Sequence, residues 1–402
     1  MQISSAFFAA LTLALSAIAA PSAANESLSG SLMRPLRVAT FNTSLNHNEA
    51  GGLIEQLSGD HLAARQVAAV IQRVRPDLVL LNEFDYDIDG KAAELFVSRY
   101  LGEGQFGERA ISYAHRFQAP VNTGVASGLD LTGDGQTDGP GDAWGFGMHP
   151  GQYGMLVLSR YPIDREHVRT FQQLRWSAMP GALAPRMPDN KTAWYADETW
   201  QQLRLSSKSH WDVPVQTPLG TLHFLTAHPT PPVFDGKEDR NGRRNFDEIR
   251  LWAEYLTNAD TTWLCDDSGR CGGLDANARF VIAGDYNADP LDGESIAGAI
   301  TQLIGHPRVL PMVAPTSTGA ATAATADPEL AASKRTPAAQ HTGAFGLRAG
   351  NMRIDYVLPS VGFEVIRSGV FWPPSDRPEA QWLQASDHRM VWVDLRLATA
   401  AN

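Results

Sequence analysis

Apolar runs that end on polar side chains recur along this chain. Residues 36–42 (LRVATFN) and 77–83 (DLVLLNE) are short, mostly apolar runs with the character of β-strands. Between them, the apolar residues of 60–76 recur at helical spacing, with Asp60 as the expected N-cap and Pro76 as the stop. This order predicts a βαβ unit, and the continuous apolarity of the second run predicts a strand that is buried on both faces.

The same alternation of elements continues to the end of the chain. A helix is expected over 243–258, and strands over 153–163, 220–228, 278–287, 352–360 and 390–397. A polar, Gly-rich passage occupies about 102–150, and a low-complexity Ala/Thr/Pro tract at about 314–340 is expected to form a mobile loop. Because no linker divides the strands, we expect one domain over residues 34–398.

Composition and charge narrow the range of partners. The 402 residues are 43% hydrophobic and carry a formal net charge of −11. This negative charge argues against a broad basic surface that binds nucleic acid. It is compatible with an enzyme that binds phosphate locally through metal ions.

The N-terminus has the features of a secretory signal peptide. Its apolar run, about residues 7–20, is short for a membrane span, and small residues follow it. We expect a signal peptide over residues 1–24 and export to the periplasm or the extracellular space. Because no Lys or Arg precedes Phe7, an uncleaved anchor remains the alternative. No later segment has the length and apolarity of a transmembrane helix.

Two cysteines, Cys265 and Cys271, lie six positions apart in the polar stretch CDDSGRC. In an exported protein this spacing predicts a disulfide that closes a small hairpin loop. The bond is expected to shape the loop more than to stabilise the fold, because the closed loop is short.

The polar residues at the strand ends form a chemically coherent set. Glu83 and Asp387 are hard oxygen ligands suited to Mg²⁺ or Mn²⁺, and Asn42 offers a neutral amide oxygen. Asp355 and His388 could form a carboxylate–imidazole pair in which the carboxylate orients the ring. Any one of these residues could equally well cap a turn, so the prediction depends on the set.

Three further strand-end residues add to this set. Asp285, in IAGDYNADP, could position or deprotonate a metal-activated water, and Asn287 could donate to the charge that develops on the phosphoryl group. His228 supplies a second imidazole for phosphate binding or for protonation of the leaving group.

In order along the chain, the segments TFN, LLNE, YGMLVLSRYP, LTAHP, AGDYNADP, RIDYVL and SDHRMVW resemble the endonuclease/exonuclease/phosphatase superfamily, which includes DNase I-like nucleases, sphingomyelinases and inositol polyphosphate phosphatases. The resemblance covers about residues 36–397. It implies a four-layer α/β sandwich, with two packed mixed β-sheets flanked by helices and the active site at one end. It also implies that the 102–150 insertion lies near that end.

The resemblance assigns a role to each matching position. Asn42 and Glu83 would bind the divalent metal, and Asp387 would approach it or a second metal. Asp285 would act on the attacking water, Asn287 would contact phosphate, Asp355 would orient His388, and His228 would be a second catalytic histidine. Arg160 falls near a phosphate-contacting arginine of some members, although a surface salt bridge is the alternative. Asn82 stands where Gln is more usual, which leaves the metal ligand Glu83 intact.

The insertion contains a second candidate metal site. Its stretch DLTGDGQTDGPGD follows the opening of a calcium loop, with Gly at the sharp turn, although the closing Glu is absent. A structural Ca²⁺ and a solvated acidic turn are both consistent with it. The candidate ligands are Asp130, Thr132, Asp134, Gln136, Asp138 and Asp142.

Two functions are consistent with these observations. The first is an exported, divalent-metal-dependent phosphoesterase that acts on nucleic acid, phospholipid or small phosphodiesters by attack of a metal-activated water. The second is a non-catalytic protein on the same fold that binds surfaces through the calcium loop. The sequence implies no stable protein partner.

Overall fold

The computed structural model of the protein describes residues 34–398, apart from residues 190, 258–260, 327 and 329–331. The predicted signal peptide at residues 1–24 lies outside the described residues. By its internal contacts the chain divides into two units, residues 1–34 and residues 35–402. The second unit holds the two sheets and their helices. Among the described helices, none combines the length and the apolarity that a membrane span requires.

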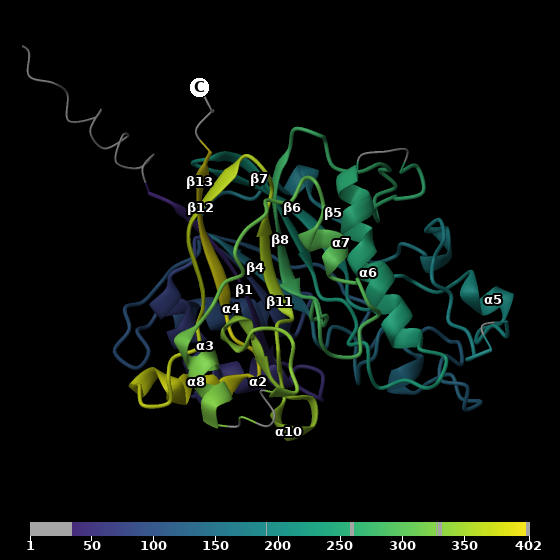
Figure 1. Cartoon of the computed structure of the whole chain (residues 1–402), viewed down its shortest axis with the longest axis horizontal. Coiled ribbons are helices and arrows are strands. Elements are labelled where there is room, and N and C mark those ends of the chain that lie inside the picture. Colours follow the sequence, from purple (N-terminus) through teal and green to yellow (C-terminus); the bar gives the residue numbers. More distant parts are fainter. Residues whose placement is uncertain (1–33, 190, 258–260, 327, 329–331, 399–402) are drawn as a thin grey trace, which may run out of the picture. The chain divides into compact units, whose positions relative to one another are not determined.

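Six strands form the first sheet (Figure 1). The predicted βαβ unit lies at its centre, because β1 (Leu36–Leu45) pairs in parallel with β2 (Leu78–Phe84) and α3 (Leu62–Val74) connects them. The neighbouring strands are antiparallel, and the order is β12 (Phe363–Val370), β13 (Val391–Leu397), β1, β2, β4 (Met155–Ser159) and β3 (His115–Phe117).

Five strands form the second sheet. Its order is β11 (Asp355–Pro359), β8 (Arg279–Asp285), β7 (Gly220–Ala227), β6 (His210–Thr217) and β5 (Arg169–Thr170). Only β7 and β8 are parallel neighbours in it. A small separate ladder joins β9 (Gly343–Ala344) to β10 (Asn351–Met352).

The two sheets pack face to face with helices outside them, as the four-layer prediction requires. The alternating side chains of strand β2 show this layering. Leu78 and Leu80 belong to the core between the sheets, whereas Val79 and Leu81 belong to the core beneath the helices. All four side chains are fully buried, which confirms the prediction of a strand covered on both faces.

Helices cover the outer face of each sheet (Figure 1). The apolar faces of α2 (Gly52–Ser58), α3 and α4 (Lys91–Leu95) pack on the first sheet, together with the π-helical segment Phe96–Leu101 and the 3₁₀ segment Pro378–Ala385. On the second sheet lie α6 (Arg240–Thr257) and α7 (Thr301–Ile304). Short helices α5 (Asp197–Trp200) and α10 (Gly346–Ala349) lie in connecting segments.

Two local predictions were wrong. The low-complexity tract at 314–340 is not simply a loop, because it contains α8 (Thr318–Ala326), which buries Ala320. The N-cap of α3 is His61 rather than Asp60, whose carboxylate instead lies 3.3 Å from the Arg65 guanidinium.

The insertion at 102–150 lies against the ends of β2 and β6. His149 Nε2 lies 4.0 Å from Asp85 Oδ2, just after β2, and the N–H of Asn122 donates to the carbonyl of Lys208 (2.9 Å). The insertion also supplies β3, an edge strand of the first sheet. It therefore extends from the sheet edge to the strand ends, near the place that the resemblance implied.

The predicted disulfide between Cys265 and Cys271 is present and closes a hairpin loop. The carboxylates inside this loop anchor it to β5: Asp266 accepts from the Arg169 guanidinium (2.7 Å), and Asp267 accepts from the Thr170 hydroxyl (2.7 Å). The loop is thus tied to the edge strand of the second sheet by buried hydrogen bonds as well as by the backbone.

Candidate active site

Sheet topology brings the predicted residues together at one end of the sandwich. Strands β1, β2, β7 and β8 run toward this end and carry polar residues at or just beyond their last positions. Strands β11 and β13 run the opposite way, so their first residues lie there too, and Asp355 is directly opposite Asp285. The residues that meet here are Asn42, Glu83, His228, Asp285, Asn287, Asp355, Asp387 and His388.

A buried chain of acid, imidazole and acid lies at the centre of the site. His388 Nδ1 lies 3.0 Å from Asp355 Oδ2, and its Nε2 lies 3.6 Å from Asp285 Oδ2. Burial alone would lower the pKa of His388, but the charges of Asp355 and Asp285 outweigh it and raise that pKa to about 10. The ring is therefore an imidazolium at neutral pH, and the Asp355 carboxylate fixes its orientation.

The protonation of Asp285 follows from the same contacts. Burial acts to raise the pKa of Asp285, yet the neighbouring His388 and His228 hold it below its ordinary value. His228 Nε2 lies 3.4 Å from Asp285 Oδ2, while burial and the charge of Lys208 lower the pKa of His228. His228 is thus a neutral ring beside an ionised carboxylate. Its Nδ1 is buried without a hydrogen-bond partner among the described residues.

Glu83 and Asp285 face the same small space. The side-chain nitrogen of Asn42 lies 3.1 Å from Glu83 Oε1 and 3.0 Å from Asp285 Oδ2. Asn46 binds the other Glu83 oxygen at 2.9 Å. Two carboxylates around one amide concentrate negative charge, and hard oxygen ligands of this kind fit a divalent cation such as Mg²⁺ or Mn²⁺.

Two of the site residues adopt a left-handed backbone conformation, Glu83 with φ 54° and Asn287 with φ 52°. Such conformations cost energy for residues other than glycine and are held by surrounding contacts. For Asn287 these are a bond from its N–H to Asp285 Oδ1 (2.9 Å) and one from its side-chain amide to the Pro229 carbonyl (3.1 Å). Asn287 therefore both forms the turn after β8 and remains beside Asp285.

Asp387 lies at the mouth of the site rather than inside it. Its side chain is 52% exposed, with Oδ1 at 3.9 Å from His388 Nε2 and 3.4 Å from the Ser44 hydroxyl. It can approach a cation only from the solvent side of the cluster. Its predicted role as a metal ligand stays a prediction.

The described residues contain one group of three His and carboxylate side chains whose ligand atoms lie within 4.8 Å of one another, namely Asp285, Asp355 and His388. This group is better explained as a hydrogen-bonded chain than as a metal cage, because His388 Nδ1 is already bound to Asp355. The other candidate cation ligands are the carboxylates of Glu83 and Asp285. Asn42 directs its amide nitrogen toward both of them, whereas its side-chain oxygen accepts from the Ser44 N–H (3.2 Å), so its role as a metal ligand stays a prediction.

Lys208 is a candidate site residue that the sequence pattern did not reveal. It lies just before β6, is only 6% exposed, and interacts electrostatically with Glu248, Glu83 and Asp285. Burial lowers the pKa of its ammonium group. In the sequence, the only signal is a single Lys within the polar run SSKSH ahead of a strand.

A buried carboxylate holds the Lys208 segment in place. Glu248 on α6 accepts bonds from the N–H of Ser207 (2.6 Å) and from the N–H of Thr230 (2.7 Å). One side chain thus fixes the residue before Lys208 and the segment after His228. Helix α6 therefore positions two parts of the site from behind the second sheet.

Asn82, which stands where Gln is more usual, joins the two sheets. Its side chain is fully buried, donates to the Ala227 carbonyl (3.3 Å) and accepts from the Asp285 backbone N–H (3.3 Å). The shorter amide therefore fixes Asp285 relative to the neighbouring Glu83.

The prediction for Arg160 was wrong. Residue 159 pairs with Leu78, whereas Met155 pairs with Asn82, so Arg160 lies at the end of the sheet opposite Glu83. Its guanidinium lies 3.4 Å from Asp77. This salt bridge is the alternative that the sequence had left open.

Three carboxylates of the candidate calcium loop accept hydrogen bonds from backbone N–H groups. Asp130 accepts from the N–H of Gly133 (2.6 Å) and Gly135 (2.9 Å), and Asp134 accepts from that of Gln136 (2.8 Å). Asp142 accepts from the N–H of Leu131 (2.9 Å). The loop is internally hydrogen-bonded, and its carboxylates do not belong to the one three-residue group found in the described structure. Binding of Ca²⁺ by Asp130, Thr132, Asp134, Gln136, Asp138 and Asp142 stays a prediction.

Comparison with known proteins gives one family. The sequence model of the Endonuclease/Exonuclease/phosphatase family matches residues 39–388. A search of curated proteins finds no match.

The similar solved structures are distant. An endonuclease/exonuclease/phosphatase from Beutenbergia cavernae is 20% identical with a TM-score of 0.48, over 91% of this chain and 72% of its own. The human Nocturnin catalytic domain is 12% identical with a TM-score of 0.45, over 90% and 95% of the two chains. Sphingomyelinase C from Streptomyces griseocarneus is 16% identical with a TM-score of 0.42, over 90% and 99%.

Proposed function

The chain belongs to the Endonuclease/Exonuclease/phosphatase family, and on that premise we propose that it is an exported, divalent-metal-dependent phosphoesterase. It hydrolyses phosphate ester bonds, either as a phosphodiesterase of nuclease type or as a phosphatase. The observation that carries the proposal is the meeting of Glu83, Asp285 and the oriented His388 at one end of the sandwich.

Each residue has a role in this reaction. Glu83 and Asn42 would hold the cation, with Asp387 approaching from solvent; a bound Mg²⁺ or Mn²⁺ lowers the pKa of water and neutralises phosphate charge. Asp285 is ionised and accepts the proton of the attacking water. As the new P–O bond forms and the ester P–O bond breaks, the His388 imidazolium can give its Nε2 proton to the leaving oxygen.

Positive charge and neutral donors around this centre support the binding of a phosphate. Lys208 places a buried ammonium near Glu83 and Asp285, where it can pair with a phosphoryl oxygen. His228 and Asn287 flank Asp285 and keep its carboxylate in place. Removing one such preorganised charge or donor typically costs about 10²- to 10³-fold in kcat.

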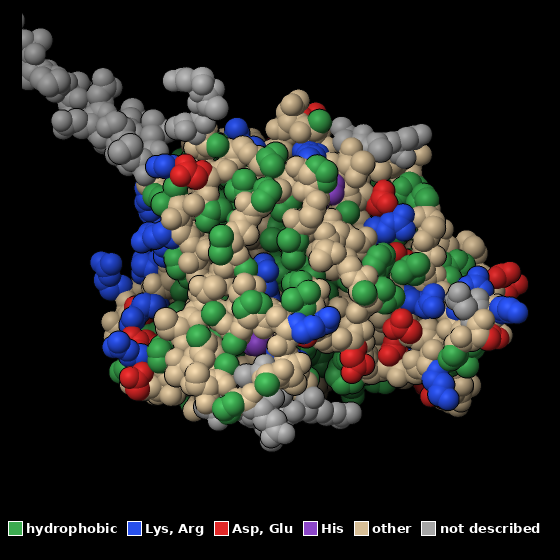
Figure 2. Space-filling model, viewed as in Figure 1, with side chains coloured by type: hydrophobic (Ala, Val, Ile, Leu, Met, Phe, Trp, Pro, Cys, Tyr) green, Lys and Arg blue, Asp and Glu red, His purple; other side chains and the backbone are tan. Residues whose placement is uncertain are grey.

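Charge supports a small substrate rather than a long polyanion. The net charge is −11, and on the face shown in Figure 2 Lys and Arg side chains lie along the left edge and also on the right, where they are interspersed with most of the Asp and Glu side chains. No continuous basic stripe crosses that face. The alternative function, calcium-dependent surface binding, is the weaker candidate, since backbone N–H groups already donate to Asp130 and Asp142 in the loop.

A substrate panel tests the proposal. The purified protein is assayed on duplex DNA, RNA, sphingomyelin, a nitrophenyl phosphodiester and a nitrophenyl phosphomonoester, with Mg²⁺, Mn²⁺ and Ca²⁺ supplied separately. We expect hydrolysis of at least one phosphate ester with Mg²⁺ or Mn²⁺. Absence of hydrolysis across the whole panel contradicts the proposal.

A further inference from the structure

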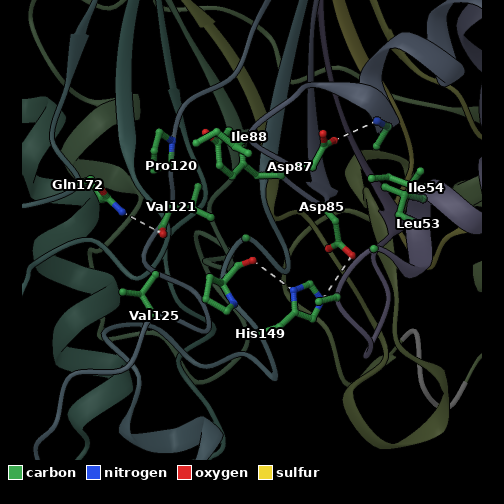
Figure 3. A pocket seen from close by; sticks show the side chains of 16 residues that line it. Leu53, Ile54, Asp85, Asp87, Ile88, Pro120, Val121, Val125, His149 and Gln172 are labelled. Carbon is green, nitrogen blue, oxygen red and sulfur yellow. Dashed lines mark hydrogen bonds and ion pairs between the residues drawn. The ribbon is translucent and has the colours of Figure 1, made fainter.

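A pocket with a volume of about 360 Å³ lies beside the end of β2 (Figure 3). Its walls come from the turn before α2 and the first part of that helix, from residues 85–88 after β2, from residues 120–125 of the insertion, and from residues 149–151 at the end of the insertion. In Figure 3, Val121 and Val125 lie on one side and Leu53 and Ile54 on the other, with Asp85 and His149 between them. The proposed reaction makes no use of this pocket.

Three parts of the pocket wall are attached to the active site. Asp85 follows Glu83 by two residues. The segment that leads to the wall residue Ala50 carries Asn46, which binds Glu83 Oε2 at 2.9 Å. Asn122, next to the wall residue Val121, donates its N–H to the carbonyl of Lys208 at 2.9 Å. The pocket is therefore fixed relative to Glu83 on one side and Lys208 on the other.

The chemistry of the wall is apolar. Leu53, Ile54, Val121, Val125 and Ala92 present hydrocarbon, and no Lys or Arg belongs to the lining residues of this pocket. A phosphate or another anionic group would find no Lys or Arg partner there. An uncharged hydrocarbon or aryl group would lose no hydrogen bond on entering.

The two carboxylates of the wall are already occupied. Asp85 accepts from the N–H of His47 (2.8 Å) and of Tyr153 (3.0 Å), and Asp87 accepts from that of Lys91 (2.7 Å). They add negative charge near the pocket without offering free bonds. A polynucleotide extending from the reaction site into the pocket would bring its next phosphate against this charge.

An exposed apolar residue lies at the edge of the pocket. Ile88 is 86% exposed and belongs to the wall. A large apolar side chain left in water beside a pocket gains from contact with an apolar ligand, because the contact removes both surfaces from water.

We propose that this pocket binds an apolar group esterified to the substrate phosphate, so that the preferred substrates are phosphodiesters of hydrophobic alcohols rather than polynucleotides. The proposal rests on the proposed function, since it names the substrate class of that reaction site. The phosphate lies at Glu83, Asp285 and Lys208, while the hydrocarbon lies between α2 and the insertion.

Binding of simple alkyl phosphates tests the pocket separately from catalysis. Calorimetry with Mg²⁺ measures the dissociation constants of methyl phosphate and hexyl phosphate for the purified protein. Each buried CH₂ strengthens binding by up to about fourfold, so we expect hexyl phosphate to bind at least about tenfold more tightly than methyl phosphate. Equal dissociation constants overturn the proposal.

Two variants assign the effect to this pocket. Ala50 and Ile88 are exposed wall residues, so we expect the fold to tolerate Ala50→Trp and Ile88→Asp, and melting curves of both variants check this. Each is expected to reduce the preference for hexyl phosphate to about threefold or less. The matched control is Val313→Asp, at a position with the same 86% exposure outside the pocket, and it retains the full preference. A full preference in both wall variants overturns the proposal.

Two further measurements separate the possible failures. Tighter binding of thymidine 5′-phosphate than of hexyl phosphate would identify a nucleoside as the occupant and overturn the proposal. Hydrolysis of a nitrophenyl phosphodiester reports the proposed function by itself. If the protein hydrolyses the diester but shows no chain-length preference in binding, the pocket proposal fails and the proposed function stands. If it is inactive but still binds hexyl phosphate more tightly, the proposed function fails and the pocket proposal stands.

Discussion

Two carboxylate–imidazole pairs in this protein have nearly the same geometry and different surroundings. His388 Nδ1 lies 3.0 Å from Asp355, and His223 Nδ1 lies 2.8 Å from Asp212. The second oxygen of Asp212 accepts the Tyr255 hydroxyl at 2.6 Å. In contrast, the second nitrogen of His388 faces Asp285 at 3.6 Å.

The difference shows that such a pair is not by itself a sign of chemistry. His223 lies within β7, where its partners complete a network inside the sheet. His388 lies just before β13, at the end where strands of both sheets bring further charge. Position at the strand ends, with the second ring nitrogen facing the carboxylates of Asp285 and Asp387, therefore distinguishes the His388 pair from the His223 pair.

The largest expected effect comes from substitutions that remove His388 or Asp285 and leave the pair of His223 and Asp212 intact. His388→Ala should lower kcat for a nitrophenyl phosphodiester by about 10²- to 10⁴-fold, the range of acid–base catalysis. Asp285→Ala should remove hydrolysis to a similar or greater extent. The control, His223→Ala, should change kcat less than about threefold. Equal losses in the His388 and His223 variants would contradict the distinction.

A third histidine, the buried His210, has no carboxylate partner for its ring among the described residues. His210 is bound by the Ser206 hydroxyl (2.7 Å) and the Glu248 carbonyl (2.9 Å), and burial lowers its pKa from 6.5 to about 4. Between pH 6.5 and 4 the unfolded chain binds a proton that the folded ring does not, so the free energy of unfolding falls as the pH falls. The loss approaches about 3 kcal/mol at the lower limit.

Urea unfolding at pH 7.5, 5.5 and 4.5 measures this loss. His210→Gln should reduce the fall in the free energy of unfolding over that range, even if it lowers stability at every pH. An unchanged pH dependence in the variant would show that His210 titrates normally in the folded protein.

Removal of the buried ammonium tests the part of the site that the sequence did not reveal. Lys208→Met keeps the length of the side chain and should lower kcat/KM by about 10²-fold, since one charge aimed at phosphate is lost. Lys91→Met, at an exposed lysine paired with Glu94 on α4, serves as the control and should have no effect. A wild-type value of kcat/KM in the Lys208 variant would show that Lys208 does not act in the site.

The smallest expected effect concerns the structural pair. Asp212→Asn should lower the free energy of unfolding by about 2 kcal/mol, because its bonds to His223 and Tyr255 are weakened, and should leave kcat unchanged. Urea unfolding and the phosphodiester assay on the same sample measure both quantities. A large loss of kcat at unchanged stability would mean that the two regions are coupled.

Local pattern predicted the parts of the fold in which burial repeats along the chain. The strands β1, β2 and β8 and the helix α3 follow from apolar runs, and polar residues at the strand ends point to the site. Strand β6 has no such pattern, because Asp212 and Pro214 interrupt its apolar residues. Its identity depends on pairing with β7, a contact that no local window contains.

The site residues that the sequence missed or misplaced depend on distant partners. Lys208 is informative only because Glu83 and Asp285 lie near it in space. Arg160 follows a strand, as expected, but that strand is antiparallel to β2 and ends at the other side of the sheet. Strand direction, which is a property of the pairing, decides which strand ends belong to the site.

Hydrolysis of a nitrophenyl phosphodiester before and after metal removal shows whether the strand-end cluster is a metal-dependent phosphoesterase site. The wild-type protein and Glu83→Gln are treated with EDTA, and Mg²⁺ or Mn²⁺ is then titrated back. We expect wild-type activity to disappear and to be restored by the metal, and the variant to need a higher metal concentration for a lower maximum. Activity that survives complete chelation, or an unchanged metal dependence in Glu83→Gln, would contradict the assignment of the strand-end cluster as a metal-dependent phosphoesterase site.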